Sequence, residues 1–198
     1  MYCFLPPNAA SGTPPPIPHG WDGLIRTYGD PRDPDNPARA SKTWAANNLV
    51  AMSLPYPMRL AWEPANVVRS ISCHRLVAPS LKVILQEIMT NARLMVKERD
   101  GQGMSIAYYD AAVLRLLAAQ RLDLYGGCYA YRLKRGIDQV SVHSFGAAID
   151  LDPDHNGLGD ASPDMPDWVV AIFEAHGWVW GGRWSRPDPM HFQRATGY

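Results

Sequence analysis

Residues 141–150 read SVHSFGAAID, and this stretch decides how the rest of the chain is interpreted. It places His143 and Asp150 seven positions apart, with small and apolar residues between them. Both side chains can bind a metal ion or carry a proton, whereas the intervening residues have the composition of a buried segment. A strand over residues 147–152 turns Asp150 away from its apolar neighbours. The turn that Gly146 permits then brings His143 toward the same cavity as Asp150.

A second stretch, DPMHFQ at residues 188–193, supplies a partner for the first. A strand over residues 190–193, paired beside the first strand, brings His191 opposite Asp150. Two imidazoles and one carboxylate are the ligand set of a catalytic zinc site, which keeps its fourth position for water. These donors suit zinc, although other divalent metals also accept them. The sequence therefore predicts one zinc ion bound by His143, Asp150 and His191.

Asp188 lies three residues before His191 and fits a proton carrier better than a fourth ligand, since a fourth protein ligand would close the site. A nearby carboxylate can take the proton of the attacking water and pass it to a leaving amine. The developing oxyanion needs a positive partner, and Arg132 is the candidate, with Arg135 as second choice. Spacing alone leaves open another interpretation, in which His143 and Asp150 share a structural hydrogen bond and Asp188 caps a turn.

Composition excludes several classes of function. The chain has 198 residues, a formal net charge of zero and a sequence pI near 7, so it lacks the basic surface of a nucleic-acid binder. No apolar run reaches the roughly 20 residues of a membrane-spanning helix, and we expect no membrane insertion. Three cysteines without a CxxC pair favour buried or free thiols over a disulfide framework. We expect a single soluble domain and a monomer.

The pattern along the chain predicts an α+β domain. Residues 1–42 are rich in proline, which suppresses long helices, and we interpret them as an extended arm that wraps a domain over residues 43–198. Within the arm, residues 20–29 can dock on the core through Trp21, Leu24, Ile25 and Tyr28. Apolar spacing and breaker residues predict the following elements: helices over 78–98, 111–122 and 165–177, and strands over 58–63, 67–74, 147–152 and 190–193. This order indicates a small antiparallel sheet with helices packed on one side.

Residues 152–160, DPDHNGLGD, imitate a calcium-binding loop because Asp152, Asp154 and Asn156 stand at the spacing of its ligands. The acidic residue expected at the twelfth position is replaced by Pro163, and no helix precedes the loop. A plain turn is therefore favoured, and a weak calcium site stays open as an alternative.

The two motifs together resemble the zinc D,D- and L,D-peptidases of bacterial cell walls. SVHSFGAAID matches the pattern S-x-H-x-x-G-x-A-x-D, and GWVWGGRWSRPDPMHFQ carries the second motif about 40 residues later. The resemblance implies the D,D-peptidase and Hedgehog type of fold. It also implies zinc ligation by His143, Asp150 and His191, with Asp188 as general base and an upstream arginine, Arg132, near the substrate carbonyl.

The resemblance implies a peptidase that hydrolyses peptidoglycan stem peptides, with Ser141, Trp184 and Arg135 as further candidates for contact with the substrate. Within this group we expect an L-alanyl-D-glutamate endopeptidase of the endolysin type. The alternatives are a D-alanyl-D-alanine carboxypeptidase and a non-catalytic cell-wall-binding or phage structural module on the same fold. The N-terminal residues do not read as a signal peptide, so we expect synthesis in the cytoplasm. The resemblance to endolysins then implies release to the wall through a phage holin.

Overall fold

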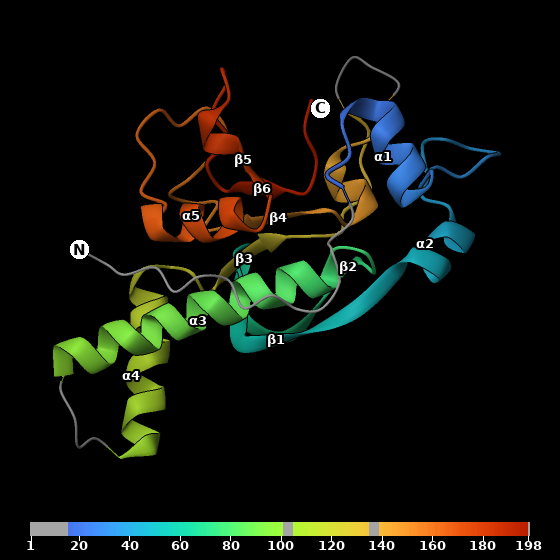
Figure 1. Ribbon diagram of the computed structural model, residues 1–198. Helices are drawn as coiled ribbons and strands as arrows, with labels where there is room; N and C mark the ends of the chain where they lie inside the picture. The colour runs from blue at the N-terminus through green and yellow to red at the C-terminus, as the bar shows by residue number, and fades with distance from the viewer. Residues whose placement is uncertain (1–15, 101–104, 135–138, 198) are drawn as a thin grey trace.

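The structure is a computed structural model that describes residues 16–100, 105–134 and 139–197. Its centre is a six-stranded open sheet with the strand order β2-β1-β3-β4-β6-β5 (Figure 1). All neighbouring strands pair antiparallel except β1 and β3, which run parallel. The predicted α+β class with a mainly antiparallel sheet is confirmed.

Strands β1 (Leu49–Leu60) and β2 (Glu63–His74) form a long hairpin at one edge of the sheet. The sequence predicted a strand over residues 58–63, which overlaps only the end of β1; the earlier part of β1 contains Pro55 and Pro57, which cannot donate to a strand ladder. The structure accommodates both prolines in a register shift, since Ser53 pairs with Ser70 and the next pair joins Met58 to Val68. A bulge of this kind lets a proline-containing segment remain part of a sheet.

The other half of the sheet consists of short strands, of which β4 and β6 carry the two motifs with His143, Asp150 and His191 at or beside them. These strands are β3 (Leu124–Gly127), β4 (Ala148–Leu151), β5 (Val179–Trp180) and β6 (His191–Gln193). Strand β6 lies between β4 and β5, so the second motif is inserted beside the first. The predicted strands at residues 147–152 and 190–193 are therefore confirmed to within two residues.

Helices α3 (Ala78–Asp100) and α5 (Asp167–Ala175) pack against each other, and α3 also packs along β1, whereas α4 (Ile106–Ala119) packs on α3 (Figure 1). Phe173 of α5 stacks on Phe192 of β6 with a ring-centroid distance of 3.9 Å. Phe192 pairs with Ile149, so this face of β4 and β6 is the apolar one. The opposite face is left for Asp150 and His191.

The N-terminal region contains more helix than its proline content predicted. Helices α1 (Gly20–Tyr28) and α2 (Lys42–Asn48) precede the sheet. Leu24 and Tyr28 are buried, and Trp21 and Ile25 pack on the core at its margin, so this patch docks as expected. Residues 1–15 of the predicted arm lie outside the described residues.

The segment before α1 also contacts the far end of the chain. The amide of Gly20 donates to the carbonyl of Thr196 at 2.8 Å, and the amide of Thr196 donates to the carbonyl of Pro18 at 2.9 Å. His19 and Thr196 form an isolated parallel bridge. We call this contact the N–C clasp. Among the described residues, no helix has the length and apolar character required to cross a membrane.

Candidate metal centre

The first metal-ligand candidate is held by a short 3-10 helix, η1 (Val142–Phe145). Ser141 caps η1, because its hydroxyl accepts a hydrogen bond from the amide of His143 at 3.3 Å. Gly146 ends η1 in the left-handed conformation, with φ +64°, and a Cβ at this position would lie 2.8 Å from the amide nitrogen of His74. Only glycine combines this φ with this close approach, which explains the glycine of the motif.

The second and third candidates come from paired strands. Asp150 of β4 lies directly opposite His191 of β6, so both side chains project from the same face of the sheet. The neighbouring strand β3 approaches closely, since a Cβ at Gly126 would lie 2.9 Å from the Cβ of Asp150. The absence of a side chain at Gly126 therefore makes room for the carboxylate.

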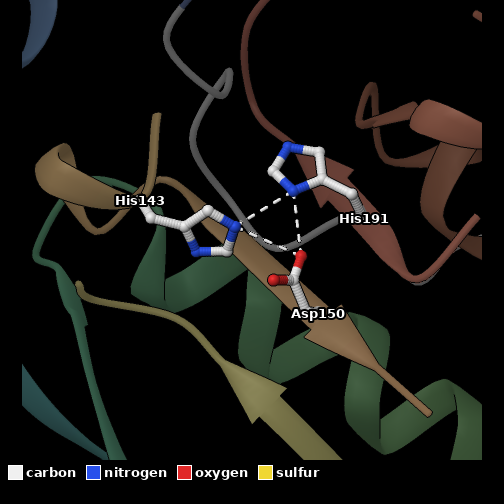
Figure 2. Close-up of side chains that lie close together, drawn as sticks. All are labelled: His143, Asp150 and His191. Carbon is white, nitrogen blue, oxygen red and sulfur yellow. Dashed lines mark hydrogen bonds and ion pairs between the residues drawn. The ribbon is translucent and has the colours of Figure 1, made fainter. Parts of the chain in front are cut away.

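His143, Asp150 and His191 point toward one another from η1, β4 and β6 (Figure 2). The Oδ1 atom of Asp150 lies 2.9 Å from Nδ1 of His191 and 3.2 Å from Nε2 of His143, and the two nitrogens are 3.0 Å apart. All three side chains are buried, with 1–6 % of each residue exposed. Within the described residues, this is the group of histidine, cysteine and acidic side chains that can hold a metal ion.

The hydrogen bonds behind the two imidazoles decide which nitrogen faces the centre. The Nδ1 atom of His143 lies 2.8 Å from the carbonyl of Cys128, and Nε2 of His191 lies 3.1 Å from Oε1 of Gln193. Because a carbonyl oxygen only accepts, each of these nitrogens carries the proton. In the neutral form of each ring, the other nitrogen then directs a lone pair toward the carboxylate of Asp150.

When both imidazoles are neutral in this way, three electron-pair donors converge and repel one another unless a proton or a metal cation joins them. A tetrahedral zinc with bonds of about 2.0–2.2 Å keeps its ligand atoms about 3.3–3.6 Å apart. The observed separations of 2.9–3.2 Å are close to these values. The donor set and its spacing therefore fit zinc with only a small outward movement of the side chains.

The pKa values of Asp150 and His191 are shifted because the three side chains lie so close together. Burial by itself would raise the pKa of Asp150, but the adjacent imidazoles of His143 and His191 outweigh it and hold the pKa well below its usual range. Burial would likewise lower the pKa of His191, but the hydrogen bond to Asp150 reverses the direction and raises it. The site thus keeps Asp150 ionised, which is the form that binds a metal.

Asp188 lies beside this centre on the loop between η2 (Gly181–Arg183) and β6. Its amide donates to the carbonyl of Gly181 at 3.0 Å, and its own carbonyl accepts from the amide of His191 at 3.0 Å. A Cβ at Gly181 would lie 2.5 Å from the carbonyl oxygen of Asp188, so this glycine permits the approach.

The carboxylate of Asp188 has an unused hydrogen-bonding atom. Its Oδ1 is buried and has no hydrogen-bond partner among the described residues. Burial raises the pKa of the Asp188 carboxyl and the nearby charge of Asp150 adds to this effect, while His191, His143 and Arg132 only partly offset it. A carboxylate with raised basicity and a free oxygen is suited to accept a proton.

The remaining predicted residues occupy different settings. The side chain of Arg132 is exposed, and its charge acts on Asp188, while its amide donates to the hydroxyl of Ser144 at 2.9 Å. Arg135 lies outside the described residues. Ser141 serves as the cap of η1, and its contact with a substrate stays a prediction.

Trp184 lies next to the centre, with its ring 5.4 Å from the ring of His191. It also lines an open groove of about 360 Å³. The other groove residues come from β5, the loop after η2, the end of β6 and the segment after it, and they are uncharged: Val179, Ser185, Gln193, Ala195, Thr196 and Gly197. The groove therefore starts beside His191 and ends at the N–C clasp.

The loop at residues 152–160, whose sequence imitates a calcium-binding loop, has polar residues that serve a structural purpose. Both carboxylate oxygens of the buried Asp152 are engaged, one by Arg121 at 2.8 Å and the other by His155 at 2.9 Å. The side-chain amide of Asn156 donates to Asp152 as well, and the carbonyl of Asn156 accepts from the amide of Met190 at 2.9 Å. The guanidinium of Arg121 supplies the positive charge here, and the loop supports the segment that leads to His191.

The site has the components of a metal-dependent peptidase centre: two buried imidazoles, one buried carboxylate, and a second carboxylate nearby whose pKa is raised. Residues 135–194 match the family model described as D-alanyl-D-alanine carboxypeptidase. This match covers both motifs and confirms the resemblance to the zinc D,D-peptidases. No curated protein and no solved structure matches the chain.

Sequence reasoning missed three contributors to the site. The carbonyl of Cys128 is a main-chain acceptor, which no residue type reveals. Gly181 lies in the second motif, and only the fold shows its approach to Asp188. Gln193 had a signal, because a residue two positions after His191 on a strand projects from the same face.

Proposed function

We propose that the protein is a zinc metallopeptidase that hydrolyses peptide bonds in the stem peptides of peptidoglycan. The observation that carries this proposal is the convergence of three buried donor atoms beside a half-buried carboxylate of raised basicity. His143, Asp150 and His191 would hold the ion. When bound there, zinc supplies a Lewis acid that polarises the scissile carbonyl and lowers the pKa of water.

The chain's own residues then have separate tasks. Asp188 takes the proton of the attacking water on its free Oδ1 and delivers it to the leaving amine. Arg132, whose charge already acts on Asp188, stabilises the negative charge that develops on the carbonyl oxygen. Trp184 forms the wall between the metal centre and the groove, where it flanks the stem peptide.

Within this class we propose an L-alanyl-D-glutamate endopeptidase. The open groove beside His191 supports this choice, because an endopeptidase must accommodate substrate residues on both sides of the scissile bond. The second candidate is a D-alanyl-D-alanine carboxypeptidase, which the description of the matching family favours.

Mass spectrometry of products from purified peptidoglycan tests both candidates. The endopeptidase releases new amino-terminal glutamate, whereas the carboxypeptidase releases free D-alanine, and a chelator should abolish either product. His143→Ala and His191→Ala should lose both zinc and activity. Asp188→Asn should keep zinc and lose activity by about 10²–10⁴-fold, since only the proton carrier is removed.

Two results would contradict this mechanism. The first is hydrolysis of peptidoglycan that persists in a protein shown to contain no metal. The second is an Asp188→Asn variant with wild-type activity. Binding to peptidoglycan without any released product would instead favour a non-catalytic wall-binding module.

A further inference from the structure

Gln193 is buried, with 3 % of the residue exposed, and lies two residues after His191 on β6. It projects from the metal-binding face of the sheet, because Asp150 and His191 form one register pair and Ala148 and Gln193 form another pair two residues away. Its side chain therefore lies directly behind the imidazole of His191, on the side away from Asp150.

The orientation of the Gln193 amide is fixed by the backbone. Its Nε2 group donates to the carbonyl of Ala195 at 3.0 Å, and its Oε1 faces Nε2 of His191 at 3.1 Å. Reversing the amide would place its oxygen against the carbonyl of Ala195, where two acceptors would repel each other. Oε1 must therefore face His191, and the Nε2 atom of His191 must carry the proton.

We propose that Gln193 is the positioning residue that selects Nδ1 of His191 as the zinc-binding nitrogen. The carbonyl of Cys128 performs the matching task for His143, but through the opposite ring atom, so that Nε2 of His143 faces the centre. The two histidines thus bind through different nitrogens, each held by its own acceptor. This inference rests on the proposed zinc site and adds the residue that fixes its geometry.

The chemistry of the acceptor explains why a glutamine suits this place. An apolar side chain would leave Nε2–H of His191 buried and unpaired, and the ring could then adopt either tautomer or rotate. Acceptors of this kind behind a metal-bound histidine change metal affinity by about 10–100-fold when they are removed. Gln193 also lines the groove, so the same amide joins the groove wall to the metal centre.

The test uses the full-length protein and compares Gln193→Leu with Gln193→Glu. Leucine removes the acceptor at similar size, whereas glutamate keeps an oxygen in the same position. Gln120→Leu makes the same chemical change at the end of α4, away from the centre, and serves as the matched control. Zinc affinity is measured by competition with a chromophoric chelator, and the position of the remaining ring proton of His191 is read from long-range ¹H–¹⁵N spectra of the zinc-loaded protein.

Wild-type protein should show the proton on Nε2 of His191. Gln193→Leu should lose this single tautomer and bind zinc about 10–100-fold more weakly. Gln193→Glu should keep the proton on Nε2 of His191, although its second oxygen meets the carbonyl of Ala195, and Gln120→Leu should remain close to wild type. A wild-type proton on Nδ1 overturns the inference without any variant. Unchanged affinity and tautomer in Gln193→Leu overturn it as well, while leaving the zinc site intact. A wild-type protein that binds no zinc overturns both the inference and the proposed function.

Discussion

At the scale of the residue, a buried histidine outside the metal centre has a structural role. His74 is fully buried between Tyr28 and Trp44, far in sequence from the metal motifs. Its Nδ1 accepts a hydrogen bond from the amide of Leu76 at 3.1 Å, and its Nε2 contacts the carbonyl of Tyr28 at 3.2 Å. Both ring atoms are used by the neutral form, so a second proton would break the bond to Leu76.

This arrangement predicts a dependence of stability on pH. Burial lowers the pKa of His74 from 6.5 to about 4, although the hydrogen bond to Tyr28 opposes the shift. Between these two values the unfolded chain binds a proton that the folded protein does not, so the free energy of unfolding falls as the pH falls. The loss at pH 4 should be about 3 kcal/mol relative to neutral pH.

Urea denaturation at a series of pH values, with wild type and His74→Asn, measures this contribution. The difference in pH dependence between the two proteins isolates His74 from the carboxyl groups. Curves that remain parallel from neutral pH to pH 4 would show that His74 does not cause the loss.

Residue type revealed part of the site in advance. His143, Asp150 and His191 could be brought together from the sequence, because a strand alternates its faces and paired strands align their side chains. Their acceptors could not all be foreseen, since the carbonyl of Cys128 belongs to the main chain and its place depends on the tertiary fold. The same limitation applies to the buried Oδ1 of Asp188.

At the scale of the element, glycines set the distance between segments. Gly181 brings η2 against the loop that carries Asp188, and an alanine there would push the Asp188 backbone away. Gly181→Ala should therefore retain zinc while activity falls by about 10²-fold, because a displacement of about 1 Å from the reactive geometry has this effect. Gly157→Ala is the control, since its Cβ would meet only an ordinary contact with Pro153 at 3.6 Å.

Activity on peptidoglycan and zinc content of the two purified variants measure this effect. Equal activity of Gly181→Ala and Gly157→Ala would mean that the position of Asp188 does not depend on η2. Loss of zinc in Gly181→Ala would assign the glycine to the metal centre itself.

Prediction of elements succeeded where periodicity was strong and failed where proline was present. The apolar spacing of residues 78–98 identified α3 almost completely, because a buried helical face repeats regularly. In contrast, α1 and the first half of β1 were missed. Proline argues against both elements locally, yet packing on the core stabilises α1 and a bulge absorbs the prolines of β1.

At the scale of the whole molecule, the metal centre depends on segments that are distant in sequence. His143 and Asp150 come from η1 and β4, whereas His191 comes from β6, which is inserted between β4 and β5. The calcium-like loop adds a second connection, because Asn156 holds the amide of Met190. The ligands are thus positioned only when most of the sheet has formed.

The N–C clasp has a consequence for the rate at which the groove wall opens. Ala195, Thr196 and Gly197 line the groove, and the backbone hydrogen bonds to Pro18 and Gly20 hold Thr196 in place. The amides of Gly20 and Thr196, which bond across this contact, should therefore exchange their hydrogens for deuterium at matched rates, as one cooperative event. Hydrogen–deuterium exchange with residue resolution measures both rates, and clearly different values would mean that the two segments separate independently. Matched rates would mean that the lifetime of this contact determines how long the groove wall stays formed. That lifetime would then depend on an N-terminal segment that carries none of the predicted catalytic residues.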